Sequence, residues 1–291
     1  MTLVETSPLP PLLQGEGNTQ ITLMILPFLL TLFKAVAIQL IAALGIFFVF
    51  GYILAKLQER TQNNYYQTVG WKGILWTAWF GTPIHELGHV FFAKLFHHKI
   101  EHISLFRPNP ETGNLGHVNH TYNKYSLYQR LGNFFVGAAP MLFGSAVLII
   151  LLYFLVPNAK EAFQPLSTEQ TSPIIILISL KTTLLKLFAI ANLSSWKFWL
   201  FLYLSFCVAS HISPGKQDLK NMWRGFAWLA AILILVNLIA LSLRINITHY
   251  IINLNRYLGL IFGIFTYATA ISLLHLILST IILKPFKKNR L

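Results

Sequence analysis

Long apolar stretches are the feature that most limits what this chain can fold into. Each is long enough to cross the ~30 Å hydrocarbon core of a bilayer as an α-helix. The chain is 55% hydrophobic and only 11% charged, well below the roughly 25% charged residues of soluble domains. The sequence therefore predicts an all-α polytopic membrane protein with about six transmembrane helices. The predicted spans are roughly 30–54, 71–96, 131–156, 196–213, 225–243 and 257–283.

The formal net charge of +13 raises the question of nucleic acid as a partner. The basic residues are scattered between the apolar segments, without a continuous stripe or a recognisable nucleic-acid-binding module, which argues against that partner. With six spans both termini lie on one side, and that side carries the larger share of the 22 Lys and Arg residues. The positive-inside rule makes this side cytoplasmic and the lipid bilayer the main partner of the basic residues.

Two segments depart from the pattern of spans. Residues 1–20 are rich in Pro, Gly and polar side chains, which predicts a disordered N-terminal extension before a single transmembrane domain at 21–291. The apolar run 173–193 places Lys181 and Lys186 near its middle, where each charge costs ~2.5–3.5 kcal/mol in a membrane. We therefore predict an amphipathic helix that lies in the membrane interface.

An insertion separates the second and third predicted spans. Two extended runs, 100–107 and 115–122, flank the sequence PNPETGN, whose Pro, Asn and Gly residues favour turns. This pattern predicts a β-hairpin at about 100–122, beside the end of the preceding helix.

The second span contains the sequence HELGH at 85–89. His85 and His89 lie one helical turn apart on the same face, so both imidazoles can bind one metal ion. Glu86 sits well inside the predicted span, where a carboxylate needs a partner or a cavity. HExxH on a helix is the pattern of zinc hydrolases, in which the glutamate accepts a proton from the metal-activated water. The sequence predicts a Zn²⁺ site with Glu86 as general base, against the alternative that these groups are simply hydrogen-bonded.

A catalytic zinc ion usually has three protein ligands, and the chain contains a single aspartate, Asp218. With six spans, the end of the HELGH helix and the end of the fourth span lie on the same side of the membrane. That topology brings Asp218 towards His85 and His89, and we predict that it is the third ligand. The alternatives are a helix N-cap role for Asp218 and His211 as the ligand or as a support of the metal site.

These features resemble the site-2 protease family of intramembrane zinc metalloproteases. The resemblance rests on HELGH in a transmembrane helix, on the Gly/Pro-containing span GNFFVGAAPMLFGSAV at 132–147, and on SPGKQD after the fourth span. In the family a late Asp, usually within an Asn-Pro…Asp-Gly motif, completes the zinc site, and that role carries over onto Asp218. The similarity covers about 81–225, within a catalytic core at about 71–225. No Gly follows Asp218, and the Pro-to-Asp spacing is shorter, as in a divergent bacterial branch.

The resemblance implies a metalloendopeptidase of a bacterial plasma membrane. The Lys and Arg bias, and not the resemblance, predicts that the termini and the active-site side are cytoplasmic. Its substrates would be transmembrane or membrane-associated proteins, cleaved near or within the bilayer. The hairpin at 100–122 would pair with an unwound substrate as an added strand. Asn133 is a candidate for orienting a substrate carbonyl, with helix capping as the alternative.

Five further histidines, at 97, 98, 102, 117 and 120, surround the motif. Membrane di-iron oxidoreductases also use many histidines, but here no HxxHH box occurs and the extra histidines fall on the predicted hairpin. A receptor or transporter that retains a degenerate site is the remaining alternative. Iron in the purified protein would favour the oxidoreductase, and an unchanged product profile after Glu86→Gln would favour the non-enzyme.

Overall fold

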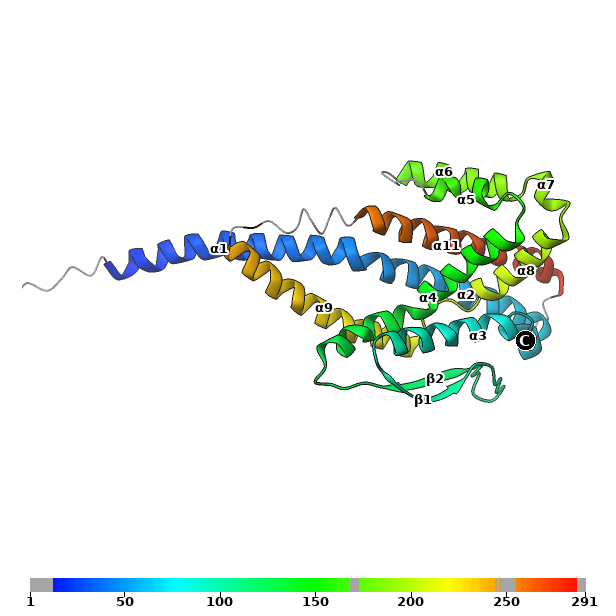
Figure 1. Cartoon of the computed structure of the whole chain (residues 1–291), viewed down its shortest axis with the longest axis horizontal. Coiled ribbons are helices and arrows are strands. Elements are labelled where there is room, and N and C mark those ends of the chain that lie inside the picture. Colours follow the sequence, from blue (N-terminus) through cyan, green and yellow to red (C-terminus); the bar gives the residue numbers. More distant parts are fainter. Residues whose placement is uncertain (1–12, 168–172, 244, 246–254, 287–291) are drawn as a thin grey trace, which may run out of the picture.

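The computed structural model describes residues 13–167, 173–243, 245 and 255–286. Most of these residues are helical, and the long helices lie side by side, with α1 extending away from the others (Figure 1). The elements are α1 (Leu13–Leu40), a π-helical turn η1 (Ile41–Gly45), α2 (Ile46–Val69), α3 (Trp71–Leu95), β1 (Lys99–Ser104), β2 (His117–Thr121), α4 (Leu127–Leu155), α5 (Ala159–Ser167), α6 (Pro173–Leu187), α7 (Ile190–Leu193), α8 (Trp196–Ala209), α9 (Lys216–Ser242), α11 (Asn255–Leu283) and a 3₁₀ turn η2 (Lys284–Phe286).

Three described helices are long and apolar enough to cross a membrane. They are Leu127–Leu155, Lys216–Ser242 and Ile261–Leu283, and they coincide with the predicted spans 131–156, 225–243 and 257–283. Membrane-protein character is therefore supported by three helices.

The other three predicted spans also fall on helices, but of a different kind. The segment 30–54 runs across the π-helical turn between α1 and α2, α8 has only 14 residues, and α3 carries Glu86 among other polar side chains. None of these is a candidate span by length and composition, so six spans stays a prediction.

The two segments that depart from the span pattern are partly described. Helix α1 begins at Leu13, so residues 13–20 of the predicted disordered extension are helical, while residues 1–12 lie outside the described residues. The segment 173–193 forms α6 and α7, with α6 packed against α5. Both lysines of α6, Lys181 and Lys186, are exposed.

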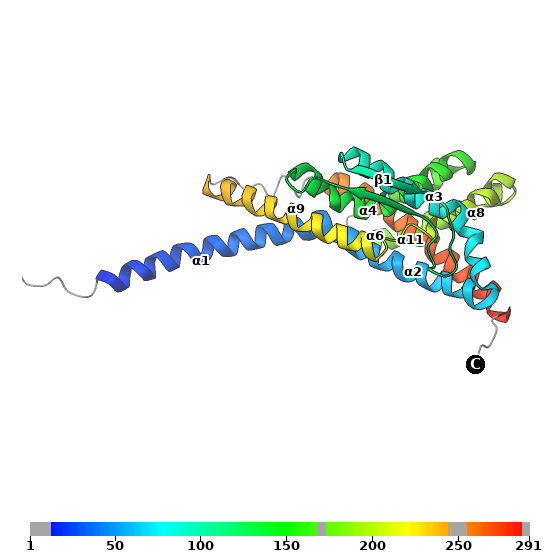
Figure 2. The ribbon, with the colours of Figure 1, turned by 90° about the horizontal axis from the view of Figure 1, so that it is seen from below.

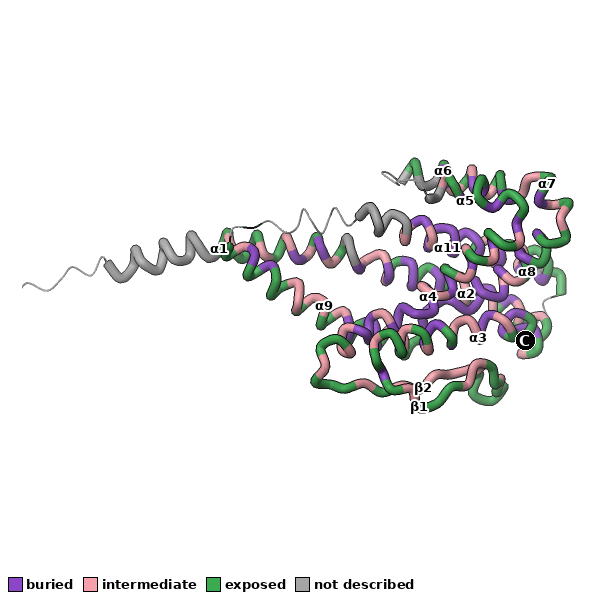
Figure 3. Tube along the Cα trace, viewed as in Figure 1, coloured by how far each residue is buried: buried purple, intermediate pink, exposed green. Residues whose placement is uncertain are grey.

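The hydrophobic core lies where α2, α4, α8 and α11 meet, and buried positions are concentrated there (Figure 3). Phe47 of α2 packs edge-to-face on Phe134 of α4 and on Phe265 of α11, with ring centroids 5.2 and 5.5 Å apart. These contacts join α2 to α4 and α11, and both α3 and α9 pack on α4.

Helices α4 and α9 touch backbone to backbone. A Cβ added to Gly225 of α9 would collide with the backbone nitrogen of Phe134, and one added to Gly137 of α4 would collide with the carbonyl oxygen of Asp218. Glycine is needed at such crossings because any side chain would separate the helices. This close crossing brings the first turn of α9 to the same region as the middle of α3, which also packs on α4.

The predicted hairpin is confirmed as a two-stranded antiparallel sheet. Its register pairs Ile100 with His120 and Ser104 with His117, with an irregularity after Ile100. The hairpin does not stay beside the end of α3, as the sequence predicted, but doubles back along the helix (Figures 1 and 2). A Cβ added to Gly116, just before β2, would lie 3.0 Å from the methyl group of Thr82 in the middle of α3. The hairpin therefore faces the HELGH turns from the side.

Candidate metal centre

The two histidines of HELGH are each anchored by a backbone carbonyl. His85 Nδ1 donates to the carbonyl oxygen of His211 at 2.6 Å, and His89 Nδ1 donates to that of Val136 at 3.0 Å. A carbonyl oxygen can only accept, so each Nδ1 carries the proton and each neutral ring has a bare Nε2. Orientation of a ligand histidine through its second nitrogen is usual in protein metal sites.

Asp218 is the third residue of α9, and its carboxylate reaches both imidazoles. Its Oδ1 lies 3.3 Å from His89 Nε2 and its Oδ2 lies 3.7 Å from His85 Nε2. Oδ2 also accepts the backbone N–H of Gly215 at 2.8 Å, which stabilises the start of the helix and fixes the side chain. The N-cap residue of α9 is thus Gly215 and not Asp218, as the alternative interpretation had it. The bond from Gly215 is compatible with a metal-ligand role for Asp218.

The three candidate ligand atoms have a spacing that fits a tetrahedral ion. The Nε2 atoms of His85 and His89 are 3.2 Å apart, beside the 3.3 and 3.7 Å distances to Asp218. With zinc–ligand bonds of about 2.0–2.1 Å, tetrahedral ligand atoms are separated by roughly 3.3 Å. When both rings are neutral and protonated at Nδ1, three lone-pair-bearing atoms converge, and one metal cation can bind all three. In the described part of the chain, no other group of three His, Cys, Asp or Glu side chains is arranged to hold a metal ion.

Glu86 is buried and lines a cavity of about 660 Å³ that is also lined by His85, His89 and Asp218. The cavity lies between α3, the hairpin and the start of α9. Its volume is typical of ligand sites, which span about 300–1,000 Å³. The remaining lining residues are Glu101, Asn114, Gly116, His117, Val118, Asn119, His120, Tyr122, Gly215, Lys216, Gln217, Asn221 and Arg224.

His211, the rival third ligand, does not bring its imidazole to the group. Its Nδ1 donates to the carbonyl oxygen of Cys207 at 3.0 Å, and its role at the site is the backbone carbonyl that holds His85. The carbonyl of Val136 has the same role for His89. Because backbone carbonyls have no sequence signature, these two anchors were not predictable from residue types.

Asn133 is buried in α4, one turn before Val136. Its Oδ1 has no hydrogen-bond partner among the described residues. It is not one of the residues that line the cavity. The predicted contact with a substrate carbonyl stays a prediction.

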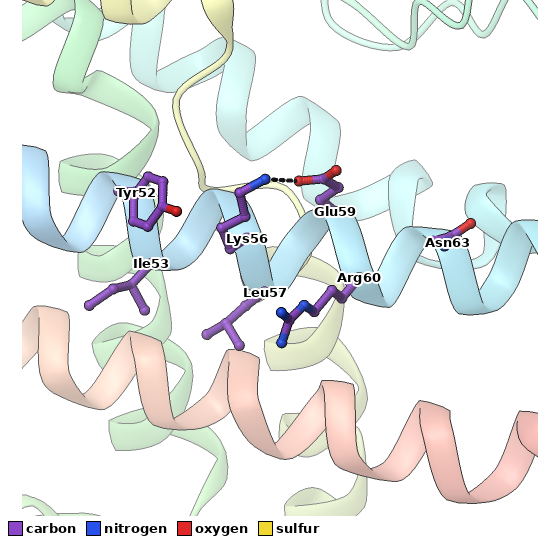
Figure 4. A pocket seen from close by; sticks show the side chains of 7 residues that line it. All are labelled: Tyr52, Ile53, Lys56, Leu57, Glu59, Arg60 and Asn63. Atoms are coloured by element: carbon purple, nitrogen blue, oxygen red, sulfur yellow. Dashed lines mark hydrogen bonds and ion pairs between the residues drawn. The ribbon is translucent and has the colours of Figure 1, made fainter.

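A second hollow, of about 770 Å³, lies on the surface of α2 and has a different character (Figure 4). All seven of its lining residues belong to this one helix, including Tyr52 and Arg60. Lys56 and Glu59 form a 2.7 Å ion pair there between side chains that are 51% and 68% exposed. Paired, solvated charges on a single helix do not form a metal centre.

The metal-binding geometry is supported by the structure of this chain and by no comparison with another protein. The sequence matches no protein-family model, and the comparisons with curated proteins and with solved structures give no match. The chain is thus assigned at a coarse level, as a mostly helical protein with three candidate membrane-spanning helices and a His85–His89–Asp218 group that could hold a metal ion.

Proposed function

We propose that this protein is an intramembrane zinc metalloprotease of the site-2 protease type. The observation that carries the proposal is the convergence of two bare imidazole nitrogens and one carboxylate, with Glu86 beside them in the same cavity. Nitrogen and oxygen ligands suit Zn²⁺, and three protein ligands leave a position for water, as in catalytic zinc sites. His85, His89 and Asp218 would hold the ion.

The proposal gives each residue a distinct task. A bound zinc ion supplies Lewis-acid polarisation and lowers the pKa of a water molecule to about 7. Glu86 accepts the proton of the attacking water and passes it to the leaving nitrogen. The carbonyls of His211 and Val136 keep the imidazoles in the tautomer that leaves both Nε2 atoms free for metal.

The proposed substrates are transmembrane or membrane-associated proteins, which must unwind before a peptide bond is accessible. Five consecutive residues, 116–120, line the cavity. Alternate side chains of a strand point to opposite faces, so the side chains of all five residues cannot point into the cavity. What these residues share is the backbone edge of β2 that does not pair with β1. We propose that an unwound substrate segment pairs with this edge as a third strand.

We also propose a membrane topology with more crossings than the three candidate spans. It has six membrane crossings, with α3 and α8 among them, in a bacterial plasma membrane. The termini and the metal centre are on the cytoplasmic side, supported by the larger share of Lys and Arg residues predicted there.

The hydrolytic function is favoured over a di-iron oxidoreductase by the hairpin histidines. His98 and His120 contact each other, as do His102 and His117. None of the four belongs to the group that could hold a metal ion.

Metal analysis and product mapping together test the function. The full chain, purified in detergent, should contain about one zinc ion per chain, and Glu86→Gln should keep it. Membranes of cells expressing the wild type should contain new protein N-termini, mapped by mass spectrometry, that Glu86→Gln abolishes. Glu59→Gln, on the exposed face of α2, is the matched control. Identical N-termini from the wild type and Glu86→Gln, or iron in place of zinc, would refute the proposal.

A further inference from the structure

A pair of histidines on the hairpin side of the cavity has a defined proton arrangement. His98, between α3 and β1, is 5% exposed, and its Nε2 donates to the carbonyl oxygen of Gln129 at 2.9 Å. Its Nδ1 lies 3.1 Å from Nδ1 of His120. Because the carbonyl can only accept, His98 carries its proton on Nε2 and has a bare Nδ1. The proton between the two Nδ1 atoms therefore belongs to His120.

This arrangement fixes what His120 offers to the cavity. With its proton on Nδ1, the neutral ring has a bare Nε2, which can accept a hydrogen bond but not donate one. Burial and the neighbouring His98 lower the pKa of His120 to about 4, so the ring is neutral near pH 7. Within the described part of the chain, Nε2 of His120 has no hydrogen-bond partner, and the residue lines the cavity of the metal centre.

The ring of His120 is also held in place. It stacks on the ring of His98 with centroids 5.0 Å apart and planes 28° apart. Tyr122 stacks on His98 in turn, with centroids 5.4 Å apart. A ring oriented by one hydrogen bond and a stacking partner presents its free nitrogen at a fixed position, as binding groups require.

We propose that His120 is a substrate-binding residue, whose Nε2 accepts a hydrogen bond from one backbone N–H of the peptide in the cavity, and that His98 is its positioning residue. This inference rests on the proposed function, which makes a peptide the occupant. An extended peptide offers carbonyl oxygens, which a bare nitrogen repels, and N–H groups, which it binds. One residue of the substrate must therefore have a free N–H, and proline is excluded at that position.

Peptide hydroxamates provide the test, since a hydroxamate binds zinc whatever the substrate preference. The zinc-loaded full chain in detergent is titrated with acetohydroxamate and with tetra-alanine carrying a hydroxamate at its carboxyl end or at its amino end. In a parallel series each amide N–H is replaced in turn by an ester oxygen. The wild type should lose about fivefold in affinity at one ester position, the loss expected for one neutral hydrogen bond.

The variants distinguish the loss of the His120 hydrogen bond from a general disturbance of the structure. His120→Ala should bind the all-amide peptide about fivefold more weakly, bind acetohydroxamate unchanged, and lose nothing further at that ester. His98→Ala should lose the same ester sensitivity, although His120 is present. His120→Gln, which returns an acceptor oxygen, should recover part of it. His102→Ala, on β1 and outside the cavity lining, is the control and should behave as the wild type.

Three other results would contradict the assignment of His120 as a substrate-binding residue. Equal ester losses in the wild type and His120→Ala would show that His120 accepts no peptide N–H. Peptides that bind the wild type no more tightly than acetohydroxamate would show that the cavity does not bind a peptide chain. In both cases the metal centre would stand. A wild type that binds no hydroxamate at all would refute the proposed function and this assignment with it.

Discussion

At the scale of single residues, the site is defined by which atoms lack protons. The Nδ1 protons of His85 and His89 are committed to backbone carbonyls, and Asp218 adds a carboxylate to the two bare nitrogens. The side chain of His211 takes no part, while its backbone carbonyl does.

This distinction predicts opposite outcomes for two substitutions. His211→Ala should keep zinc, because it leaves the carbonyl that holds His85 in place. Asp218→Ala should lose zinc, because it removes a proposed ligand atom. Metal content of the purified variants measures both, with thermal unfolding as a check that each variant is folded. If His211→Ala lost zinc and Asp218→Ala kept it, His211 and not Asp218 would be the third ligand.

The hairpin histidines predict a pH dependence of local stability. The pKa of His120 in the folded protein, about 4, lies below the ordinary value of 6.5, so folding favours the neutral ring. Its contribution to stability is complete above about pH 6.5 and is lost as the pH falls towards 4. Hydrogen exchange of the amides in 99–121, corrected for the intrinsic effect of pH, should show protection falling across this window. His120→Gln should remove that part of the change, and the same pH profile in both proteins would contradict the prediction.

At the scale of elements, the crossing of α4 and α9 positions the acid. Gly225 touches the backbone of Phe134, so a side chain at this position must push α9 away from α4 and carry Asp218 with it. Gly225→Val should therefore lower zinc affinity by about tenfold or more, as displaced supports of metal ligands do, while the helix content measured by circular dichroism is kept. Gly45→Ala is the control, because a Cβ there meets its nearest neighbour at an ordinary 3.8 Å. An unchanged zinc affinity in Gly225→Val would show that the crossing does not position Asp218.

The elements were also the part of the fold most readily predicted from sequence. The apolar window 131–156 became α4 at Leu127–Leu155, and the turn-rich insertion became a hairpin, because both signals are local. The approach of Asp218 to the histidines followed from the order and direction of the helices. The doubling back of the hairpin along α3 and the pairing of His98 with His120 depend on tertiary packing. No periodicity in the sequence encodes such contacts.

At the scale of the whole molecule, a buried polar cluster ties distant parts of the chain together. His275 of α11 is hydrogen-bonded to the hydroxyl of Tyr65 in α2 at 2.9 Å and to that of Ser210 after α8 at 2.7 Å. Phe206 stacks on the same ring, with planes 7° apart. Three segments far apart in the sequence therefore meet at one imidazole.

Removal of that imidazole should weaken the whole assembly. His275→Leu removes the partner of the buried Ser210 hydroxyl and of the part-buried Tyr65 hydroxyl, and an unpaired buried hydroxyl costs about 1–3 kcal/mol. The unfolding temperature in detergent should fall, while zinc content stays unchanged because the cluster includes no ligand. Tyr66→Phe, at an exposed position of the neighbouring helix, is the control. An unaltered unfolding temperature in His275→Leu would show that the cluster contributes no net stability.

The direction of the hairpin has a physical consequence for the surrounding lipid. Under the proposed topology, the strand that runs back along α3 exposes a row of amide and carbonyl groups at the depth of the acyl chains. Hydrocarbon cannot solvate such groups, so they must face water or another polypeptide. If the protein is the proposed protease, water beside this strand would lie within the hydrocarbon region, and a substrate helix that unwinds there would exchange its own hydrogen bonds for bonds to the strand. Water and unpaired backbone groups beside β2, and not strain in the substrate alone, would then lower the cost of opening a helix.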